Sequence, residues 1–139
     1  MSYSIQIQAF RDLIGQAGVV EDPERIATHT TDQHQLFTGS TFAVLKPAST
    51  QQVADIVKLA ARLGVGIVPQ GGNTSYCGGA TPDASGRQII ISLDRMDRIR
   101  EIDPVSMTAS VDAGAILKNV QDAAAAVGLL LPRRVLRCP

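Results

Sequence analysis

The sequence has few aromatic residues, few cysteines and no excess of either charge. Among its 139 residues there is no tryptophan, aromatic residues make up 4%, and 13 basic side chains balance 13 acidic ones. This balance gives no electrostatic footprint for nucleic acid or for an anionic membrane surface. The 2 cysteines are too few for a disulfide framework, so we expect reduced thiols and a cytoplasmic location.

Long hydrophobic runs are also missing. Every apolar run is far shorter than the roughly 20 residues that a helix needs to span a bilayer. The N-terminal stretch MSYSIQIQAFRDL lacks the charged, apolar and small-residue regions of a signal peptide. Hydrophobic residues nevertheless make up 45% of the chain, enough for the core of one domain. We therefore expect a folded protein without a membrane span.

Apolar residues near the N-terminus recur at steps of three and four. This spacing predicts an amphipathic helix that ends at Gly18, with a second short helix after Pro23. We assign residues 1–31 to an N-terminal helical segment. The apolar positions of the first helix are Ile7, Phe10, Leu13, Ile14 and Ala17.

The middle of the chain follows a strand–helix–strand pattern. FAVLKP and VGIVP are short apolar runs of the kind that form buried strands. Between them, Ser49 and Gln52 have the spacing of a capping box, and Gly64 is placed to end the helix. The pattern predicts a βαβ crossover whose two strands are parallel neighbours.

The remainder predicts strands and one further helix. QIIISL and residues 99–102 indicate strands, and SMTASVDAG alternates as a strand with one covered face does. A helical pattern from Ile116 to Val127 ends at Gly128. The fold class is α+β, a small parallel βαβ subdomain followed by part of a mixed or antiparallel subdomain.

The stretch PQGGNTSYCGG, from Pro69 to Gly79, follows the second predicted strand. Glycines allow a ligand to approach bare backbone, and successive N–H groups in such a turn form a nest for anions. No lysine or arginine lies between Pro69 and Ala80, so neutral dipoles would hold the anion. The Walker A and Rossmann glycine patterns are both absent. On pattern alone, a mobile turn without ligand and a phosphate-binding module both remain open.

A resemblance narrows these alternatives. The stretches PASTQQVADIVKLAARLGVGIVPQGGNTSYCGGATPD and IIISLDRMDRIREIDPVSMTASVDAGAILKNVQDAAAAVGLLLP resemble the FAD-binding domain of the vanillyl-alcohol-oxidase-type (PCMH-type) flavoproteins. Within them the chain is most similar to the FAD-linked D-2-hydroxyglutarate and D-lactate dehydrogenases. The likeness runs from about Asp32 to Pro132, which we assign as a partial, truncated FAD-binding domain, residues 32–132.

The resemblance implies that FAD is the cofactor and that the glycine-rich loop faces its two phosphates. Relatives that tether FAD covalently have histidine where this chain has Asn73, so non-covalent FAD is expected. Members usually have glycine where this chain has Ser75. An intact relative would oxidise a small D-2-hydroxy acid by hydride transfer to the flavin. The implied cofactor-binding residues are Pro69, Gln70, Gly71, Gly72, Asn73, Thr74 and Ser75, with Gly78 and Gly79 on the flavin side.

The likeness ends where the chain turns into RRVLRCP, residues 133–139, a basic tail foreign to the family. Our hypothesis is that the reading frame is broken after Pro132. The alternative function is therefore a catalytically inactive fragment with at most residual FAD or dinucleotide binding. Missing packing partners would expose apolar surface and favour a homo-oligomer or a loosely packed chain.

Four further residues have simple structural interpretations. Cys77 has no neighbouring His and no second cysteine at redox spacing, which favours a small packing residue. His29 and His34 lack further ligands at metal-binding spacing, which favours a solvated surface. Asp32 is interpreted as structural or close to the adenosine, and the mixed charges of DRMDRIREID favour a solvated strand edge. No catalytic residue and no metal ligand is assigned.

Overall fold

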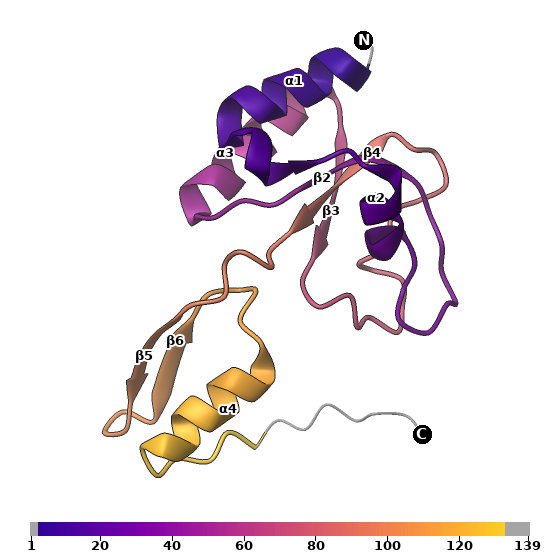
Figure 1. Cartoon of the computed structure of the whole chain (residues 1–139). Helices are drawn as coiled ribbons and strands as arrows, with labels where there is room; N and C mark the ends of the chain where they lie inside the picture. Colours follow the sequence, from indigo (N-terminus) through magenta and orange to yellow (C-terminus); the bar gives the residue numbers. More distant parts are fainter. Residues whose placement is uncertain (1–2, 133–139) are drawn as a thin grey trace. The chain divides into compact units, whose positions relative to one another are not determined.

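A computed structural model describes residues 3–132. The chain forms two compact units that divide between Met96 and Asp97. The first contains a four-stranded sheet with three α-helices, and the second contains a two-stranded hairpin with one helix (Figure 1). The predicted α+β class is confirmed.

The sheet of the first unit has the strand order β1-β2-β4-β3. These strands are β1 (Val19–Val20), β2 (Thr41–Leu45), β4 (Gln88–Ser92) and β3 (Gly66–Gln70). Strands β2 and β3 are both parallel to β4, and β1 is antiparallel to β2. The crossover is therefore parallel as predicted.

The prediction that its two strands are neighbours was wrong, because β4 lies between them. Strand β4 is buried from Ile89 to Ser92, which suits a central strand covered on both faces. Strand β3 contains the exposed Pro69, which has no N–H for a ladder and is tolerated at an edge.

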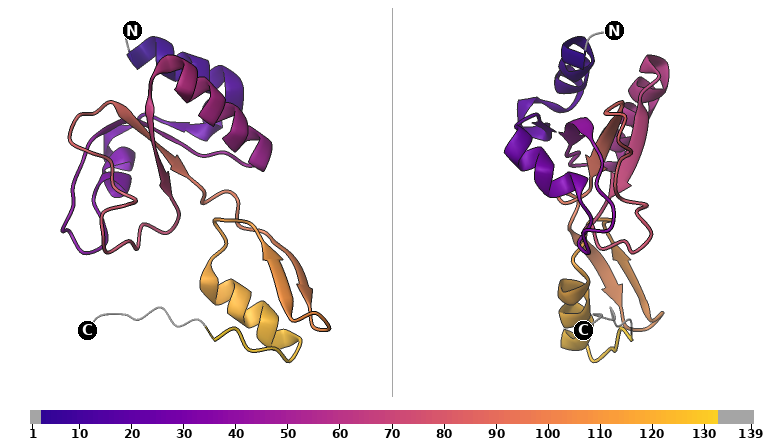
Figure 2. Two further views of the ribbon diagram at one scale, coloured as in Figure 1. Left: turned by 180° about the vertical axis from the view of Figure 1, so that it is seen from behind. Right: turned by 90° about the vertical axis from the view of Figure 1, so that its right-hand side faces the viewer.

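Helices cover both faces of this sheet (Figure 2). On one face, α1 (Tyr3–Ile14) and α3 (Thr50–Leu63) pack on the strands. On the other, α2 (Pro23–Thr30) supplies Ile26. The first face buries Phe10, Ile14, Val19, Ala43, Leu45, Ile56, Ala60, Val65, Ile89 and Ile91, and the second buries Val20, Val44, Val68 and Ile90.

The helix ends follow local sequence signals. At the start of α3, Ser49 Oγ accepts a hydrogen bond from the Gln52 N–H at 3.2 Å. Gly64 ends that helix in the left-handed region, with φ 66°. Helix α1 ends at Ile14 rather than Gly18, because Gly15 already adopts φ 80° and residues 16–18 form the 3-10 turn η1 (Gln16–Gly18). The predicted stop was therefore three residues late.

The second unit pairs β5 (Ile99–Asp103) antiparallel with β6 (Thr108–Val111) and adds α4 (Leu117–Ala126). All four residues of β6 are exposed, so the predicted covered face was wrong. The helix packs against β5, and no second layer within the described residues covers β6. Gly128, with φ 77°, follows the end of α4 as predicted.

A buried acid stabilises this second unit. The side chain of Asp112 is 1% exposed and accepts hydrogen bonds from Arg100 Nε at 2.6 Å and Arg98 Nε at 3.2 Å. Burial alone would raise the pKa of Asp112, but the bonds from Arg100 and Arg98 outweigh it and hold the pKa below its ordinary value. Two exposed arginines of the mixed-charge stretch thus pair with the buried Asp112, which lies outside that stretch.

None of the helices within residues 3–132 is both long enough and apolar enough to cross a membrane.

Candidate cofactor-binding loop

The glycine-rich loop begins where β3 ends, at the edge of the sheet formed by the carboxyl ends of its parallel strands. Ligands of parallel α/β sheets bind at this kind of edge. Gly71, Gly72 and Thr74 are exposed, while Asn73 and Ser75 are half-buried. Within residues 3–132, none of the five N–H groups from Gly71 to Ser75 donates a hydrogen bond. The loop therefore presents a run of unsatisfied donors.

The loop glycines divide into two kinds. A Cβ added to Gly78 would lie 2.9 Å from the Phe37 ring, and Gly78 also has φ 68°, so the fold itself requires glycine there. A Cβ on Gly71 would meet nothing within 4 Å, and one on Gly72 would meet only a Thr74 methyl at 3.8 Å. Neither of these two has a positive φ. Nothing within the part of the chain that the structure describes explains why these two positions lack side chains.

Asn73 joins the loop to the rest of the unit. It adopts φ 54°, a left-handed conformation that asparagine tolerates better than most residues. Its Nδ2 donates to the Thr31 carbonyl at 2.7 Å. Its Oδ1 is buried and has no hydrogen-bond partner within the described residues. Because turning the amide would set Oδ1 against the Thr31 carbonyl, the orientation is fixed.

A second segment, residues 29–40, runs alongside the loop, and we call it the bracing segment. Its contacts advance in step with those of the loop, from the end of β3 to the turn before β4. The pairs, in chain order, are His29 with Gln70, Thr31 with Asn73, His34 with Tyr76, Phe37 with Gly78, Gly39 with Pro82, and Ser40 with Asp83. The loop is thus supported along its length.

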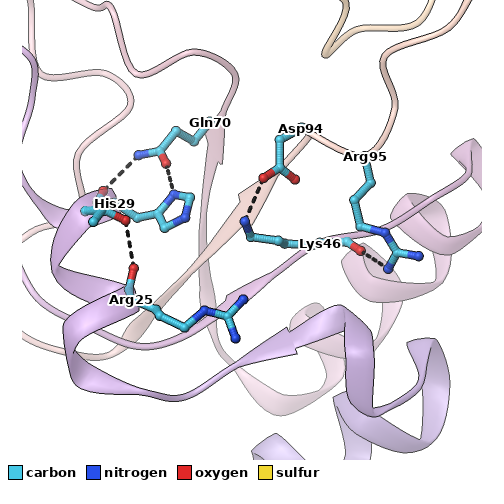
Figure 3. A network of polar contacts seen from close by, with 7 residues as sticks. Arg25, His29, Lys46, Gln70, Asp94 and Arg95 are labelled. Carbon is cyan, nitrogen blue, oxygen red and sulfur yellow. Dashed lines mark hydrogen bonds and ion pairs between the residues drawn. The ribbon is translucent and has the colours of Figure 1, made fainter.

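Gln70 is the first of these links, and its side chain is fully committed to the protein (Figure 3). The residue is 1% exposed. Nε2 donates to the carbonyls of His29 at 2.8 Å and Ala80 at 2.9 Å. Oε1 lies 2.5 Å from His29 Nδ1, so this ring nitrogen is the donor. Gln70 therefore ties both ends of the loop to α2 and has no side-chain group left for a ligand.

Asp32 organises the turn at the tip of the bracing segment. The residue is 2% exposed, and its carboxylate accepts hydrogen bonds from the N–H of Phe37 at 2.6 Å and of His34 at 3.0 Å. The Phe37 N–H is the main cause that holds the pKa of Asp32 below its ordinary value. This turn positions the His34 ring on Tyr76, with centroids 4.4 Å apart, and the Phe37 ring on Gly78.

The same sheet edge carries charged groups that follow the other two parallel strands. Lys46 follows β2 and Asp94 follows β4, and their side chains pair at 2.6 Å (Figure 3). Burial raises the pKa of Asp94, but the hydrogen bond and charge of Lys46 outweigh it, and the net shift is downward. Arg95 donates to the Lys46 carbonyl at 3.0 Å.

Sequence patterns missed part of this arrangement. His29 and His34 were assigned to solvated surface, which was wrong, since both are half-buried and contact the loop. Cys77 is exposed, so its prediction as a packing residue was also wrong. Lys46 was not singled out, although its place directly after a predicted parallel strand was a usable signal. The basic tail, 133–139, lies outside the described residues.

Among the predicted cofactor residues, Gly71 to Ser75 are those whose N–H groups donate no hydrogen bond within residues 3–132. Gln70 is buried, Pro69 pairs with Ile91 in the sheet, and Gly78 is packed under Phe37. A Cβ on Gly79 would meet only Ser75 Oγ, at 3.9 Å.

Comparison with known proteins identifies the family of the chain. The family model for the FAD-binding domain matches residues 42–138. The mitochondrial D-2-hydroxyglutarate dehydrogenase of Arabidopsis thaliana is 33% identical over 129 residues, which cover 93% of this chain and 23% of the relative. A putative mitochondrial D-lactate dehydrogenase of Schizosaccharomyces pombe is 32% identical over 133 residues, covering 91% and 25%. The chain thus spans about a quarter of the length of these relatives.

A solved structure of alkyldihydroxyacetonephosphate synthase superposes with a TM-score of 0.80 at 21% identity, covering 92% of this chain and 26% of that one. This likeness supports the fold. The α+β architecture, the open glycine-rich loop and the family match lead to one assignment. The chain belongs to the FAD-binding domain family, of the PCMH type, and is related to the D-2-hydroxyglutarate and D-lactate dehydrogenases.

Proposed function

We propose that the N–H groups from Gly71 to Ser75 hold the diphosphate of a non-covalently bound FAD. The observation that carries this proposal is the run of five backbone donors without acceptors beside two glycines that the fold does not require. A diphosphate supplies anionic oxygens to such donors, and charge-assisted hydrogen bonds to them are stronger than neutral ones. The residues present therefore fit the group.

Non-covalent binding is proposed because residue 73 is asparagine. An amide side chain has no nucleophilic atom for a bond to flavin, and Nδ2 of Asn73 is already engaged with the Thr31 carbonyl. We therefore propose that hydrogen bonds and packing, rather than a bond from residue 73, hold the FAD.

We further propose that the protein takes part in oxidising a small D-2-hydroxy acid of the D-2-hydroxyglutarate or D-lactate kind. The names of its relatives support this substrate class. Bound FAD would accept the hydride, while the residues of this chain bind and orient the cofactor. None of the described residues is assigned to the substrate.

The test replaces the two unexplained glycines. The double variant Gly71→Ala, Gly72→Ala puts two methyl groups where the diphosphate would approach the backbone. We expect the affinity for FAD, measured by flavin fluorescence titration, to fall at least tenfold. We expect the unfolding free energy of the free protein to stay equal or rise by about 0.4–1 kcal/mol per site, because alanine restricts the unfolded chain.

Gly78→Ala is the matched control in the same loop. It should lower stability, because the new Cβ meets the Phe37 ring and the backbone has a positive φ. If the double alanine variant binds FAD as tightly as the wild-type protein does, the proposal is contradicted. A wild-type protein that inorganic phosphate stabilises and FAD does not would instead favour a phosphate-binding module.

A further inference from the structure

We infer that Asp32 is a positioning residue for the cofactor loop, acting through the bracing segment rather than by touching the cofactor. This inference rests on the proposed function, since it concerns how tightly the loop binds FAD. Its starting point is a chain of contacts from one buried carboxylate to the loop backbone.

The first step is the turn itself. Asp32 accepts two backbone hydrogen bonds, and the Asp32 N–H donates to the Phe37 carbonyl at 3.1 Å. Gln35 adopts φ 57° within this turn, a conformation that costs free energy for a side chain other than glycine. The carboxylate thus helps the backbone hydrogen bonds of Asp32 to hold closed a strained turn of six residues, 32–37.

The second step leads from the turn to the loop. The N–H groups of His34 and Phe37 bond to the Asp32 carboxylate, and the rings of these same two residues contact the loop at Tyr76 and Gly78. The His34 ring stacks on Tyr76 at an interplanar angle of 23°, and the Phe37 ring covers the face of Gly78. Releasing the carboxylate would therefore free both aromatic contacts together.

The third step is energetic. The N–H groups of Gly71 to Ser75 have no partners within the described residues, so the placement of this backbone depends on the side-chain contacts of the loop, including those at its ends. The upstream end is tied by Gln70, and the downstream end is held by His34 and Phe37. A loop that is already ordered loses less conformational entropy when the ligand binds. Asp32 would therefore raise affinity by preorganisation.

Electrostatics makes the opposite prediction. A carboxylate near a diphosphate repels it, so neutralising Asp32 would strengthen binding if charge were what mattered. Asp32→Asn separates the two effects, because it removes the charge and one of the two acceptors. Asp32→Ala removes both acceptors.

The second unit offers a matched control. Asp103 also accepts two backbone hydrogen bonds in a turn, from the N–H groups of Val105 at 2.9 Å and Ser106 at 3.2 Å. Both its bonds lie within the turn between β5 and β6. Asp103→Ala therefore deletes the same kind of interaction away from the bracing segment.

The experiment measures the dissociation constant of FAD and the backbone ¹H–¹⁵N heteronuclear NOE of residues 71–79 in the free full-length chain. We expect Asp32→Ala to raise the dissociation constant about tenfold and to lower the NOE values of the loop, with Asp32→Asn intermediate. Asp103→Ala should leave both unchanged. Circular dichroism establishes that each variant is folded. If Asp32→Ala does not fold, the comparison is made with Asp32→Asn alone.

Tighter binding by Asp32→Asn, or unchanged loop NOE values in both Asp32 variants, would overturn the inference. A wild-type chain that does not bind FAD would refute the proposed function and, with it, the role of Asp32 in affinity. The NOE comparison would then still report whether Asp32 orders the loop, so the two failures are distinguishable.

Discussion

The sheet of the first unit is covered on both faces, whereas the hairpin of the second unit has a single helix beside it. The first unit buries two apolar layers around β4. The second buries Val120 and Ala124 of α4 and the charged Asp112, and leaves β6 exposed. A two-stranded hairpin is marginally stable by itself, so the ion pair and α4 carry more of its stability.

This difference bears on where the cofactor loop is built. The glycine-rich loop follows β3 of the well-buried sheet. The bracing segment, which contacts the loop, belongs to the same unit. A site whose donors are backbone N–H groups depends on the placement of the backbone, because no side chain can adjust to compensate. The first unit, whose sheet is covered on both faces, is therefore the one suited to carry the cofactor loop.

The largest effect should come from the centre of the sheet. Ile90 is fully buried, and Ile90→Ala should lower the unfolding free energy by about 2–5 kcal/mol, through lost burial and a cavity. Val120→Ala in α4 removes two methyl groups from a side chain that is 6% exposed and should cost about 1–2 kcal/mol. Urea denaturation followed by circular dichroism measures both. Equal losses of unfolding free energy in Ile90→Ala and Val120→Ala would contradict the contrast between the two units.

The next effect should come from the contact that closes the bracing segment on the loop. A Cβ on Gly39 would lie 1.8 Å from the Pro82 carbonyl oxygen, a backbone atom that cannot move aside easily. Gly39→Ala should therefore cost about 3 kcal/mol and also weaken FAD binding. Gly128→Ala, where the Cβ meets nothing within 4 Å, is the comparison in the second unit, since it tests the cost of positive φ alone. A smaller loss for Gly39→Ala than for Gly128→Ala would contradict the close contact.

The smallest effect is the pH dependence of the second unit. The pKa of Asp112 is lowered from 3.8, so its carboxylate contributes stability that is fully present above that value. The contribution is lost as pH falls through the lower folded pKa. Hydrogen exchange of residues 97–132 should accelerate over this acid range, and Asp112→Asn should show the faster exchange already at neutral pH. If Asp112→Asn and the wild-type protein exchange at the same rate at neutral pH, the ion pair contributes nothing to the stability of the second unit.

Local signals in the sequence were sufficient for most elements. The capping residues Ser49 and Gln52, the helix-ending Gly64 and Gly128 and the apolar runs of β2, β3 and β4 predicted the structure correctly, because each acts within a few residues of chain. The predicted neighbour relation of β2 and β3 was wrong, since strand order depends on which strand is buried on both faces. The exposure of β6 was missed for the same reason, as alternation cannot tell whether a second layer is present.

The sequence by itself determined the family, the glycine-rich loop and its lack of charge, because these depend on residue types in a continuous stretch. The tertiary structure alone revealed which glycines the fold requires and which it leaves unexplained. It also showed that His29, His34 and Phe37 contact the loop from 41 or 42 positions away along the chain. Asp32 holds the turn that carries His34 and Phe37. Such contacts arise from packing between distant segments, and no local pattern of residues encodes them.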